Sequence, residues 1–331
     1  MKKFKTVVLC GTKNGIDLIK FLQKKIKIDL VITSKVKRNS SPERLNAKIF
    51  CQKNGLKFYE MKSYTEYDSL KKKIKNTNID FLLSISWQRL IPEWLISKSK
   101  IVIGAHGSHQ GMNMGRGRSP MNWAILSGKK KFIVSIFKII KKDPDSGPII
   151  DTKDIKIEKF DTINSLYLKT HIEIANMVCN FIKNKTIIKN KKVKKIRYLP
   201  KISHQDGLID WRRKSEDIYN FIRSKSKPYS GAYTIQNKKI IKIETSIPIV
   251  TNVFKKYKPG TIVEFLYDKT ILIKTIDGFI QAYVDKKIYY KLKKKRLSSG
   301  NFKKQINNII RSHKSNYLNQ KINQTIVDLS L

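Results

Sequence analysis

Short apolar runs alternate with amphipathic stretches along the first half of the chain. The runs with the length and composition of buried strands lie at 6–10, 30–33, 57–60, 79–84 and 101–103. Segments between them, such as 16–25 and 46–54, have the periodicity of helices. Strands that alternate with helices predict an α/β fold with a Rossmann-like, mostly parallel sheet.

The turn after the first run, Gly11-Thr12-Lys13-Asn14-Gly15, resembles a nucleotide-binding opening. It lacks the G-x-G-x-x-G spacing, so it gives poor support for a dinucleotide site. The same strand, turn and helix also form the ordinary first unit of a parallel sheet.

The pattern changes after a Lys/Asn-rich run at 183–195, which we interpret as the approach to a linker. Short alternating strands follow, with turns at Pro259-Gly260 and Asp277-Gly278. This spacing predicts a small open β-barrel, similar to an OB fold, as the C-terminal domain. The expected division is therefore a first domain at 1–190, the β-barrel at 191–290 and a basic tail at 291–331.

The chain carries a net charge of +45, from 70 basic and 25 acidic residues among 331. Such a charge favours polyanionic partners such as nucleic acids. The lysines are nevertheless spread along the whole chain, which is typical of a compositional bias. Charge alone therefore leaves RNA binding open.

Neither the cysteines nor the histidines show the spacing of a disulfide framework or a zinc site, so we expect no metal. The three cysteines are Cys10, Cys51 and Cys179. No apolar run approaches the roughly 20 residues of a membrane-spanning helix. The run after the basic N-terminus ends too soon for a signal peptide, so we expect a cytoplasmic protein.

The stretch 101–122 carries the most evident chemistry. Its apolar start, 101–103, predicts a buried strand that leads His106 into a Gly-rich loop. Glycines let the backbone approach a ligand closely, while Arg116 and Arg118 offer fixed positive charge. The loop therefore indicates a site for an anionic or carbonyl-bearing ligand.

Two motifs here resemble the central signatures of the methionyl-tRNA formyltransferase and sugar N-formyltransferase superfamily. The first is HGS, GRGRSP and MNWAILSG within 106–128, and the second is Asp145-Ser146-Gly147-Pro148. In this family a His and an Asp, with an Asn two residues before the His, form the catalytic constellation. The resemblance therefore implies catalytic roles for His106 and Asp145, and it places Gly104 where the family has Asn.

The resemblance covers roughly residues 5–285 and implies a formyltransferase fold with 10-formyltetrahydrofolate as co-substrate. The segment 84–92 resembles the family's folate pocket, and segments within 198–234 resemble the start of its C-terminal domain. The residues implied at the folate pocket are Trp87, Gln88, Arg89, Leu90, Ile91 and Asp143. Those implied at the amine acceptor are Ser108, Arg116 and Arg118.

Formyl transfer needs an amine to attack the formyl carbon while the oxyanion that forms is stabilised. An imidazolium at His106 can donate to this oxygen, and Asp145 can take part in proton removal. We expect both side chains to converge at the carboxyl ends of adjacent strands. Losing the amide at position 104 would typically cost about 10²–10³ in rate. If the loop leaves room, Gly104→Asn should therefore raise the rate.

Three hypotheses about function remain open, two of which differ in the amine acceptor. The forms GRGRSP and Pro228-Tyr229-Ser230-Gly231-Ala232-Tyr233 slightly favour a nucleotide-linked amino sugar. The two-domain length keeps charged initiator tRNA as the alternative. The glycine at position 104 keeps a degenerate member that binds ligand or RNA without turnover as the third. The oligomeric state is not predicted.

Overall fold

The computed structural model describes residues 2–36, 44–87, 89–112, 114–140, 145, 147–184, 197–253 and 255–317. The chain forms two compact units, each built from separate segments. Unit 1 consists of Met1–Asn113, Ile133–Ile155 and Tyr167–Lys195, and unit 2 of Met114–Phe132, Lys156–Leu166 and Ile196–Leu331. The boundaries expected at residues 190 and 290 remain a prediction.

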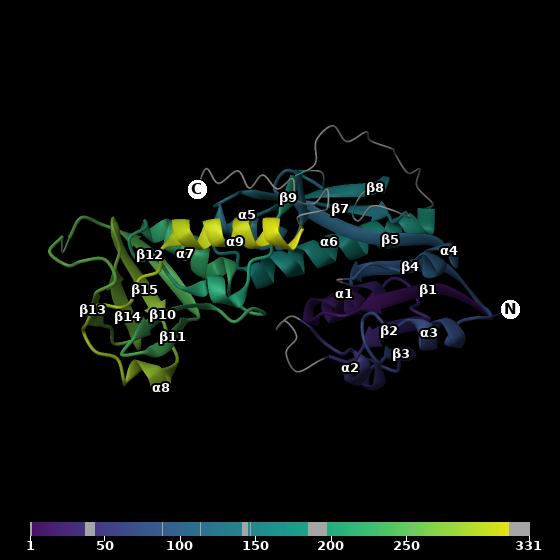
Figure 1. Ribbon diagram of the computed structural model, residues 1–331, viewed down its shortest axis with the longest axis horizontal. Helices are drawn as coiled ribbons and strands as arrows, with labels where there is room; N and C mark the ends of the chain where they lie inside the picture. Colours follow the sequence, from purple (N-terminus) through teal and green to yellow (C-terminus); the bar gives the residue numbers. More distant parts are fainter. Residues whose placement is uncertain are drawn as a thin grey trace. The chain divides into compact units, whose positions relative to one another are not determined.

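A seven-stranded sheet with the order β3-β2-β1-β4-β5-β7-β8 forms the centre of unit 1 (Figure 1). Its strands are β1 (Lys2–Cys10), β2 (Leu30–Ser34), β3 (Phe58–Met61), β4 (Thr77–Ser86), β5 (Ser99–Ser108), β7 (Lys131–Lys138) and β8 (Ile149–Lys156). The first five are parallel, whereas β7 is antiparallel to β5. The mostly parallel α/β sheet is thus confirmed.

Burial explains why the strands of unit 1 read as continuous apolar runs. All five residues of β2 are buried, as in a parallel strand that is covered on both faces. The helices of this part are α1 (Lys13–Gln23), α2 (Lys48–Lys53), α3 (Asp68–Lys73), α4 (Glu93–Ser97) and α6 (Ile163–Asn184). The Thr12 hydroxyl caps α1 by accepting from the Gly15 N–H at 3.2 Å. The Thr162 hydroxyl accepts from the Ser165 N–H at 3.3 Å in the same way at the start of α6.

Unit 2 contains a four-stranded antiparallel sheet, β12-β15-β14-β13, and the antiparallel pair β10-β11. These strands are β10 (Ala232–Gln236), β11 (Lys239–Ile243), β12 (Thr245–Val250), β13 (Ile262–Phe265), β14 (Thr270–Lys274) and β15 (Gly278–Tyr283). The other elements are β6 (Met114–Gly117), α5 (Pro120–Leu126), β9 (Arg197–Leu199), η1 (His204–Gly207), α7 (Ser215–Ser224), α8 (Lys286–Tyr289) and α9 (Phe302–Asn316). The expected C-terminal domain of antiparallel strands is confirmed.

Two buried side chains bind the segments of unit 2 together. The Arg223 guanidinium donates to the carbonyl oxygens of Asp161 at 2.6 Å and Glu158 at 3.2 Å. The Trp123 indole is buried and donates to the Pro200 carbonyl at 2.8 Å. The segments around residues 120 and 160 therefore belong to the same unit as the C-terminal strands.

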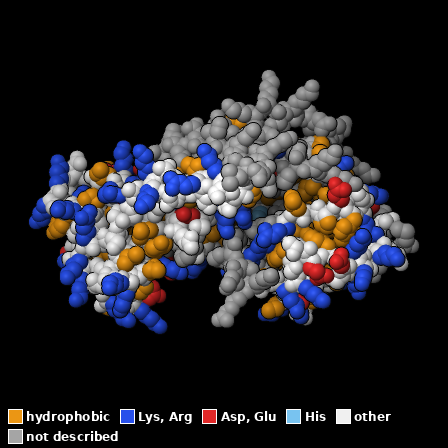
Figure 2. Space-filling model, in the orientation of Figure 1, with side chains coloured by type: hydrophobic (Ala, Val, Ile, Leu, Met, Phe, Trp, Pro, Cys, Tyr) orange, Lys and Arg blue, Asp and Glu red, His pale blue; other side chains and the backbone are white. Residues whose placement is uncertain are grey.

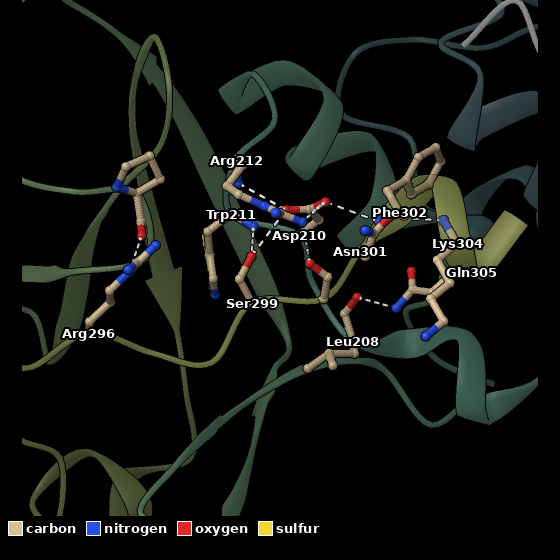
Figure 3. A network of polar contacts seen from close by, with 12 residues as sticks. Leu208, Asp210, Trp211, Arg212, Arg296, Ser299, Asn301, Phe302, Lys304 and Gln305 are labelled. Atoms are coloured by element: carbon tan, nitrogen blue, oxygen red, sulfur yellow. Dashed lines mark hydrogen bonds and ion pairs between the residues drawn. The ribbon is translucent and has the colours of Figure 1, made fainter.

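The C-terminal helix α9 is part of the folded core of unit 2. Ile306 and Ile309 are buried in its hydrophobic cluster, although the sequence assigned them to a basic tail. At the start of the helix, Asp210 accepts hydrogen bonds from Ser299 Oγ at 3.1 Å and from the Phe302 N–H at 3.0 Å (Figure 3). This part of the expected tail therefore packs as an amphipathic helix.

Candidate active site

His106 lies within β5, near its carboxyl end, rather than in the loop that the sequence suggested. Its side chain is 11% exposed. In the antiparallel pairing with β7, His106 is directly opposite Ser135. Residues opposite one another in such a pair point to the same face of the sheet. The sheet therefore fixes the direction of the imidazole.

Asp145 approaches His106 from the connection between β7 and β8. Its Oδ2 lies 3.9 Å from the His106 Nδ1, and its side chain is 34% exposed. The distance is that of a loose ion pair, longer than a hydrogen bond. Asp145 adopts a left-handed conformation with φ of 53°, which Asp tolerates better than most side chains. The two residues predicted to be catalytic thus lie close together.

The strand geometry behind this approach differs from our expectation. We expected the two side chains to converge at the carboxyl ends of adjacent strands. Because β7 is antiparallel to β5, its carboxyl end lies beside Ile103 and not beside His106. Asp145 nevertheless lies 3.9 Å from the imidazole, although it follows β7 in the chain.

Gly147 shows why the second motif needs glycine two residues after Asp145. A Cβ atom at this position would overlap the carbonyl oxygen of Lys138. The turn is also tied to β7, because the Lys138 N–H donates to the Pro148 carbonyl at 2.9 Å. Close approach to β7 therefore holds the turn that carries Asp145.

The space at Gly104 is filled by an aromatic ring. Gly104 is paired with Phe137 across β5 and β7. A Cβ atom at Gly104 would lie 2.7 Å from the Phe137 Cζ and 3.1 Å from the Ile139 Cδ1. Real Cβ atoms do not approach a neighbour as closely as 2.7 Å, so the room on which the expected gain from Gly104→Asn depends is occupied by the Phe137 ring. An amide can enter only if Phe137 moves and Ile139 shifts slightly, and the rate of this variant stays a prediction.

Two hydroxyl groups beside this site were missed by the sequence analysis. The Oγ atom of Ser135 lies 2.8 Å from the Oγ1 atom of Thr152 in β8. Ser135 shares the sheet face of His106 through the direct cross-strand pairing. The signal in the sequence was a single polar residue inside the apolar run FIVSIF.

Trp87, one of the residues expected at the folate pocket, follows β4 and belongs to an aromatic cluster. The Trp87 indole is buried and donates to the Tyr67 hydroxyl at 3.0 Å. Its ring lies 4.7 Å from that of Tyr64. Burial raises the pKa of the Tyr67 hydroxyl, so this group stays neutral over the ordinary pH range. Trp87 was expected at this pocket, whereas neither tyrosine was.

The other residues expected at the folate pocket have different surroundings. Leu90 is 74% exposed, Arg89 is also exposed, and Ile91 is half-buried. Gln88 and Asp143 lie outside the described residues. Their roles remain predictions.

At the end of β1, the Tyr64 side chain packs against the backbone of Gly11. Its hydroxyl donates to the Gly11 carbonyl at 2.8 Å, and a Cβ atom at Gly11 would lie 2.6 Å from the Tyr64 oxygen. The Arg44 guanidinium covers the ring at 4.1 Å. The turn after β1 is therefore covered by the Tyr64 side chain.

The three expected acceptor residues are distributed over both units. Ser108, in unit 1, is buried and closes a turn by donating to the Gly111 carbonyl at 2.7 Å. Arg116, in β6 of unit 2, is only 2% exposed, and Arg118 is half-buried. Their contacts with an acceptor remain predictions.

Within the described ranges, no three His, Cys, Asp or Glu side chains are grouped so that they could hold a metal ion. No helix among the described residues is long and apolar enough to span a membrane.

Comparison with known families gives two matches that together cover most of the chain. The family described as "Formyl transferase" matches residues 5–181, and "Formyl transferase, C-terminal domain" matches residues 201–314. The chain belongs to the formyl transferase family. It is a formyl-transfer enzyme, as the resemblance of its two central motifs implied.

Curated relatives of the enzyme include a methionyl-tRNA formyltransferase and a bifunctional polymyxin resistance protein. Methionyl-tRNA formyltransferase of Fusobacterium nucleatum is 29% identical over 282 residues, which are 82% of this chain and 89% of that protein. The bifunctional polymyxin resistance protein ArnA of Wigglesworthia glossinidia brevipalpis is 36% identical over 199 residues. This match covers 56% of the enzyme but only 28% of ArnA.

Solved structures share the fold at lower sequence identity. An N-formyltransferase from Helicobacter canadensis, in complex with folinic acid and dTDP-3-aminofucose, has a TM-score of 0.56 and 20% identity. The match covers 85% of the enzyme and all of that chain. Methionyl-tRNA formyltransferase from Clostridium thermocellum has a TM-score of 0.54 with 16% identity, over 85% and 100% of the two chains.

Proposed function

We propose that this enzyme moves a formyl group from 10-formyltetrahydrofolate to the primary amine of a nucleotide-linked amino sugar. The observation that carries the proposal is the 3.9 Å approach of the His106 and Asp145 side chains. Both residues match the family's catalytic motif, and both are held by backbone geometry in unit 1. A donor and a proton acceptor are the two groups that transfer to an amine requires.

In the proposed reaction, the co-substrate supplies the formyl group on a nitrogen that can leave. His106, as an imidazolium, donates a hydrogen bond to the formyl oxygen while the amine forms its bond to the formyl carbon. Asp145 accepts the proton that the amine loses and passes it on to the departing folate nitrogen. The products are a formamide and tetrahydrofolate, so atoms and charge balance.

The region after β4 supports a folate as co-substrate. Leu90 offers exposed apolar surface, and the cluster of Trp87, Tyr64 and Tyr67 lies at the same end of the sheet. Ligand pockets commonly combine such apolar walls with a few polar groups. A solved structure with a similar fold, HypX from Aquifex aeolicus, is a complex with tetrahydrofolic acid. The proposed pocket is formed by this chain's own residues 87–91.

The acceptor is proposed from the likeness to sugar N-formyltransferases. Besides the Helicobacter canadensis protein, WlaRD, a sugar 3N-formyl transferase, matches 86% of this chain and 98% of its own. The GRGRSP motif provides Arg116 and Arg118 as fixed charges for a diphosphate.

Charged initiator tRNA is the second candidate acceptor. It is favoured by the extensive match to methionyl-tRNA formyltransferases and by the net charge of +45. The described Lys and Arg side chains lie over both units on the face shown in Figure 2, without gathering in one patch. A compositional bias produces basic side chains that are spread over the surface in this way. Because no basic patch for tRNA stands out on this face, we prefer the sugar.

The test is incubation of the purified enzyme with 10-formyltetrahydrofolate and a panel of amines. The panel contains dTDP- and UDP-linked amino sugars and charged initiator tRNA, and mass spectrometry detects one added formyl group. We expect product from an amino sugar, with affinity that depends weakly on salt.

Efficient formylation of tRNA alone would establish the second candidate. In that case log K should fall with log salt by roughly 0.9 per phosphate contact on duplex. No product from any amine would contradict formyl transfer, and His106→Gln is the negative control.

A further inference from the structure

The pairing of Gly104 with Phe137 places an aromatic ring against β5, two residues before His106. The Cζ and Cε1 atoms of the ring are 2.7 and 3.0 Å from where a Cβ of residue 104 would lie. The ring therefore points its edge at the bare backbone of β5, two residues before His106. Phe137 is 2% exposed, so this volume is fully packed.

The register of β5 and β7 shows that the ring and the imidazole are neighbours on one sheet face. Gly104 is opposite Phe137, and His106 is opposite Ser135. Side chains two residues apart on a strand lie on the same face. An aromatic residue that covers a cross-strand glycine stabilises the sheet at a point where the glycine contributes no packing of its own. Phe137 is thus placed to hold the backbone that carries His106.

We propose that Phe137 is a positioning residue of the transfer site, matched to Gly104, and that the two residues act as one unit. The ring occupies the volume of the side chain at position 104 and fixes β5 beside His106. β5 then presents one side-chain donor to the formyl oxygen, the His106 imidazole. The Phe137 ring takes the space that an Asn amide at position 104 would need. This inference rests on the proposed function.

Neither member of the pair should tolerate replacement alone. Gly104→Asn forces the new side chain against the Phe137 ring, and overpacking in a filled core is destabilising. Phe137→Val leaves a cavity beside β5, which loosens the strand near His106. In the double variant the cavity takes up the new side chain, so the two changes should compensate one another. Non-additive effects of this kind are expected for residues in direct contact.

The experiment compares four full-length proteins: the wild type, Gly104→Asn, Phe137→Val and the double variant. Thermal unfolding gives the midpoint of each, and formyl-transfer kinetics give kcat and KM with the amine that the wild type accepts. We expect each single variant to lower the midpoint and the double variant to recover most of the loss. Phe137→Val should lower kcat at least fivefold with KM for the amine changed less than twofold. The double variant should exceed the kcat of Phe137→Val at least tenfold, because an amide donor now has room.

Phe181→Val is the matched control for a general loss of packing. Phe181 is a buried phenylalanine of the same unit, on α6, with its ring 6.4 Å from that of Phe81. We expect it to lower the unfolding midpoint and leave kcat unchanged. An equal loss of kcat in this control would show that Phe137 acts through stability alone and would overturn the positioning role.

Two further outcomes would also overturn the pair. One is a Gly104→Asn protein with the midpoint and kcat of the wild type, because the ring would then not exclude a side chain. The other is a double variant that is no more stable than the additive sum and no faster than Phe137→Val. If the wild type formylates no amine at all, the proposed function fails, and the positioning role fails with it. Loss of compensation in an active wild-type background rejects only the pair.

Discussion

Asp145 in unit 1 and Asp210 in unit 2 are both carboxyl groups near a basic side chain, but their surroundings differ. Asp210 is 9% exposed and accepts from the Arg212 Nε at 2.9 Å and from the Phe302 N–H at 3.0 Å, among other donors. Asp145 is 34% exposed and is 3.9 Å from His106. A carboxylate whose lone pairs are taken by hydrogen bonds is fixed in place. One that is partly open to solvent can still accept a proton from a substrate.

The pKa of Asp210 supports this distinction. Burial by itself raises the pKa of the carboxyl group, but hydrogen bonds from Arg212, Phe302 and Ser299 outweigh it and lower the pKa below the usual value. The folded state therefore favours the charged form. Its contribution to stability is present above the unfolded pKa and is lost as the pH falls through the folded value. Asp210 is thus a structural anion.

The largest effect that we expect is on catalysis, from Asp145→Asn. Asn tolerates the left-handed backbone of this position but cannot accept a proton. Loss of a general base typically costs about 10²–10⁴ in rate. We expect kcat to fall at least about 100-fold while the unfolding midpoint stays near that of the wild type. A variant that keeps full turnover would remove Asp145 from the chemistry and erase its contrast with Asp210.

The reverse pattern is expected for Asp210→Ala. The change leaves the Phe302 N–H and the Ser299 hydroxyl without their acceptor and releases the start of α9. We expect the free energy of unfolding to fall by about 2–3 kcal/mol, after a discount for the exposed Arg212. Urea titration measures the loss, and kcat per folded molecule should be unchanged. A tenfold drop in kcat for the folded protein would mean that this network also serves the reaction.

An effect of similar size but opposite sign is expected from Lys225, a buried cation of unit 2. Burial lowers the pKa of its amine from the usual 10.5 to about 8. Below pH 8 the folded protein carries the full cost of a buried charge. This cost disappears as the pH rises from about 8 to above 10.5, because the unfolded chain then binds more protons. Lys225→Met should therefore be more stable than the wild type by about 2–3 kcal/mol at pH 7, with the difference shrinking toward pH 10.5. Urea titrations at several pH values test this, and a difference independent of pH would contradict it.

Local sequence patterns predicted the elements and the proximity of the two motif residues. The apolar runs of β1, β2 and β4 were recognisable because parallel strands are buried on both faces. The motifs around His106 and Asp145 were sufficient to expect that the two side chains meet. The pattern of residues along one strand does not reveal its direction, so the antiparallel course of β7 was not predicted.

What the sequence could not show depends on partners far apart along the chain. Phe137 lies over Gly104 only because β5 and β7 pair in one particular register. The same holds for Tyr64, which reaches the Gly11 carbonyl from 53 residues away. α9 read as a basic tail because its few apolar residues find their partners in strands and helices much earlier in the chain. Long-range packing of this kind leaves no signal in a short window.

The hydrogen bonds of Arg223 have a consequence for any attempt to recombine this enzyme with a relative. Its guanidinium is bound by the carbonyl groups of Asp161 and Glu158, which precede the residues that link the two matched family regions. A chimera joined near residue 190 would take the arginine from one parent and its acceptors from the other. The acceptors are backbone carbonyl groups, which any sequence provides. Whether the hybrid keeps these hydrogen bonds therefore depends on the backbone path of the 156–166 segment more than on its side chains. A crossover placed before residue 114 would transfer all three segments of unit 2 from a single parent, at the cost of also exchanging β7, β8 and α6.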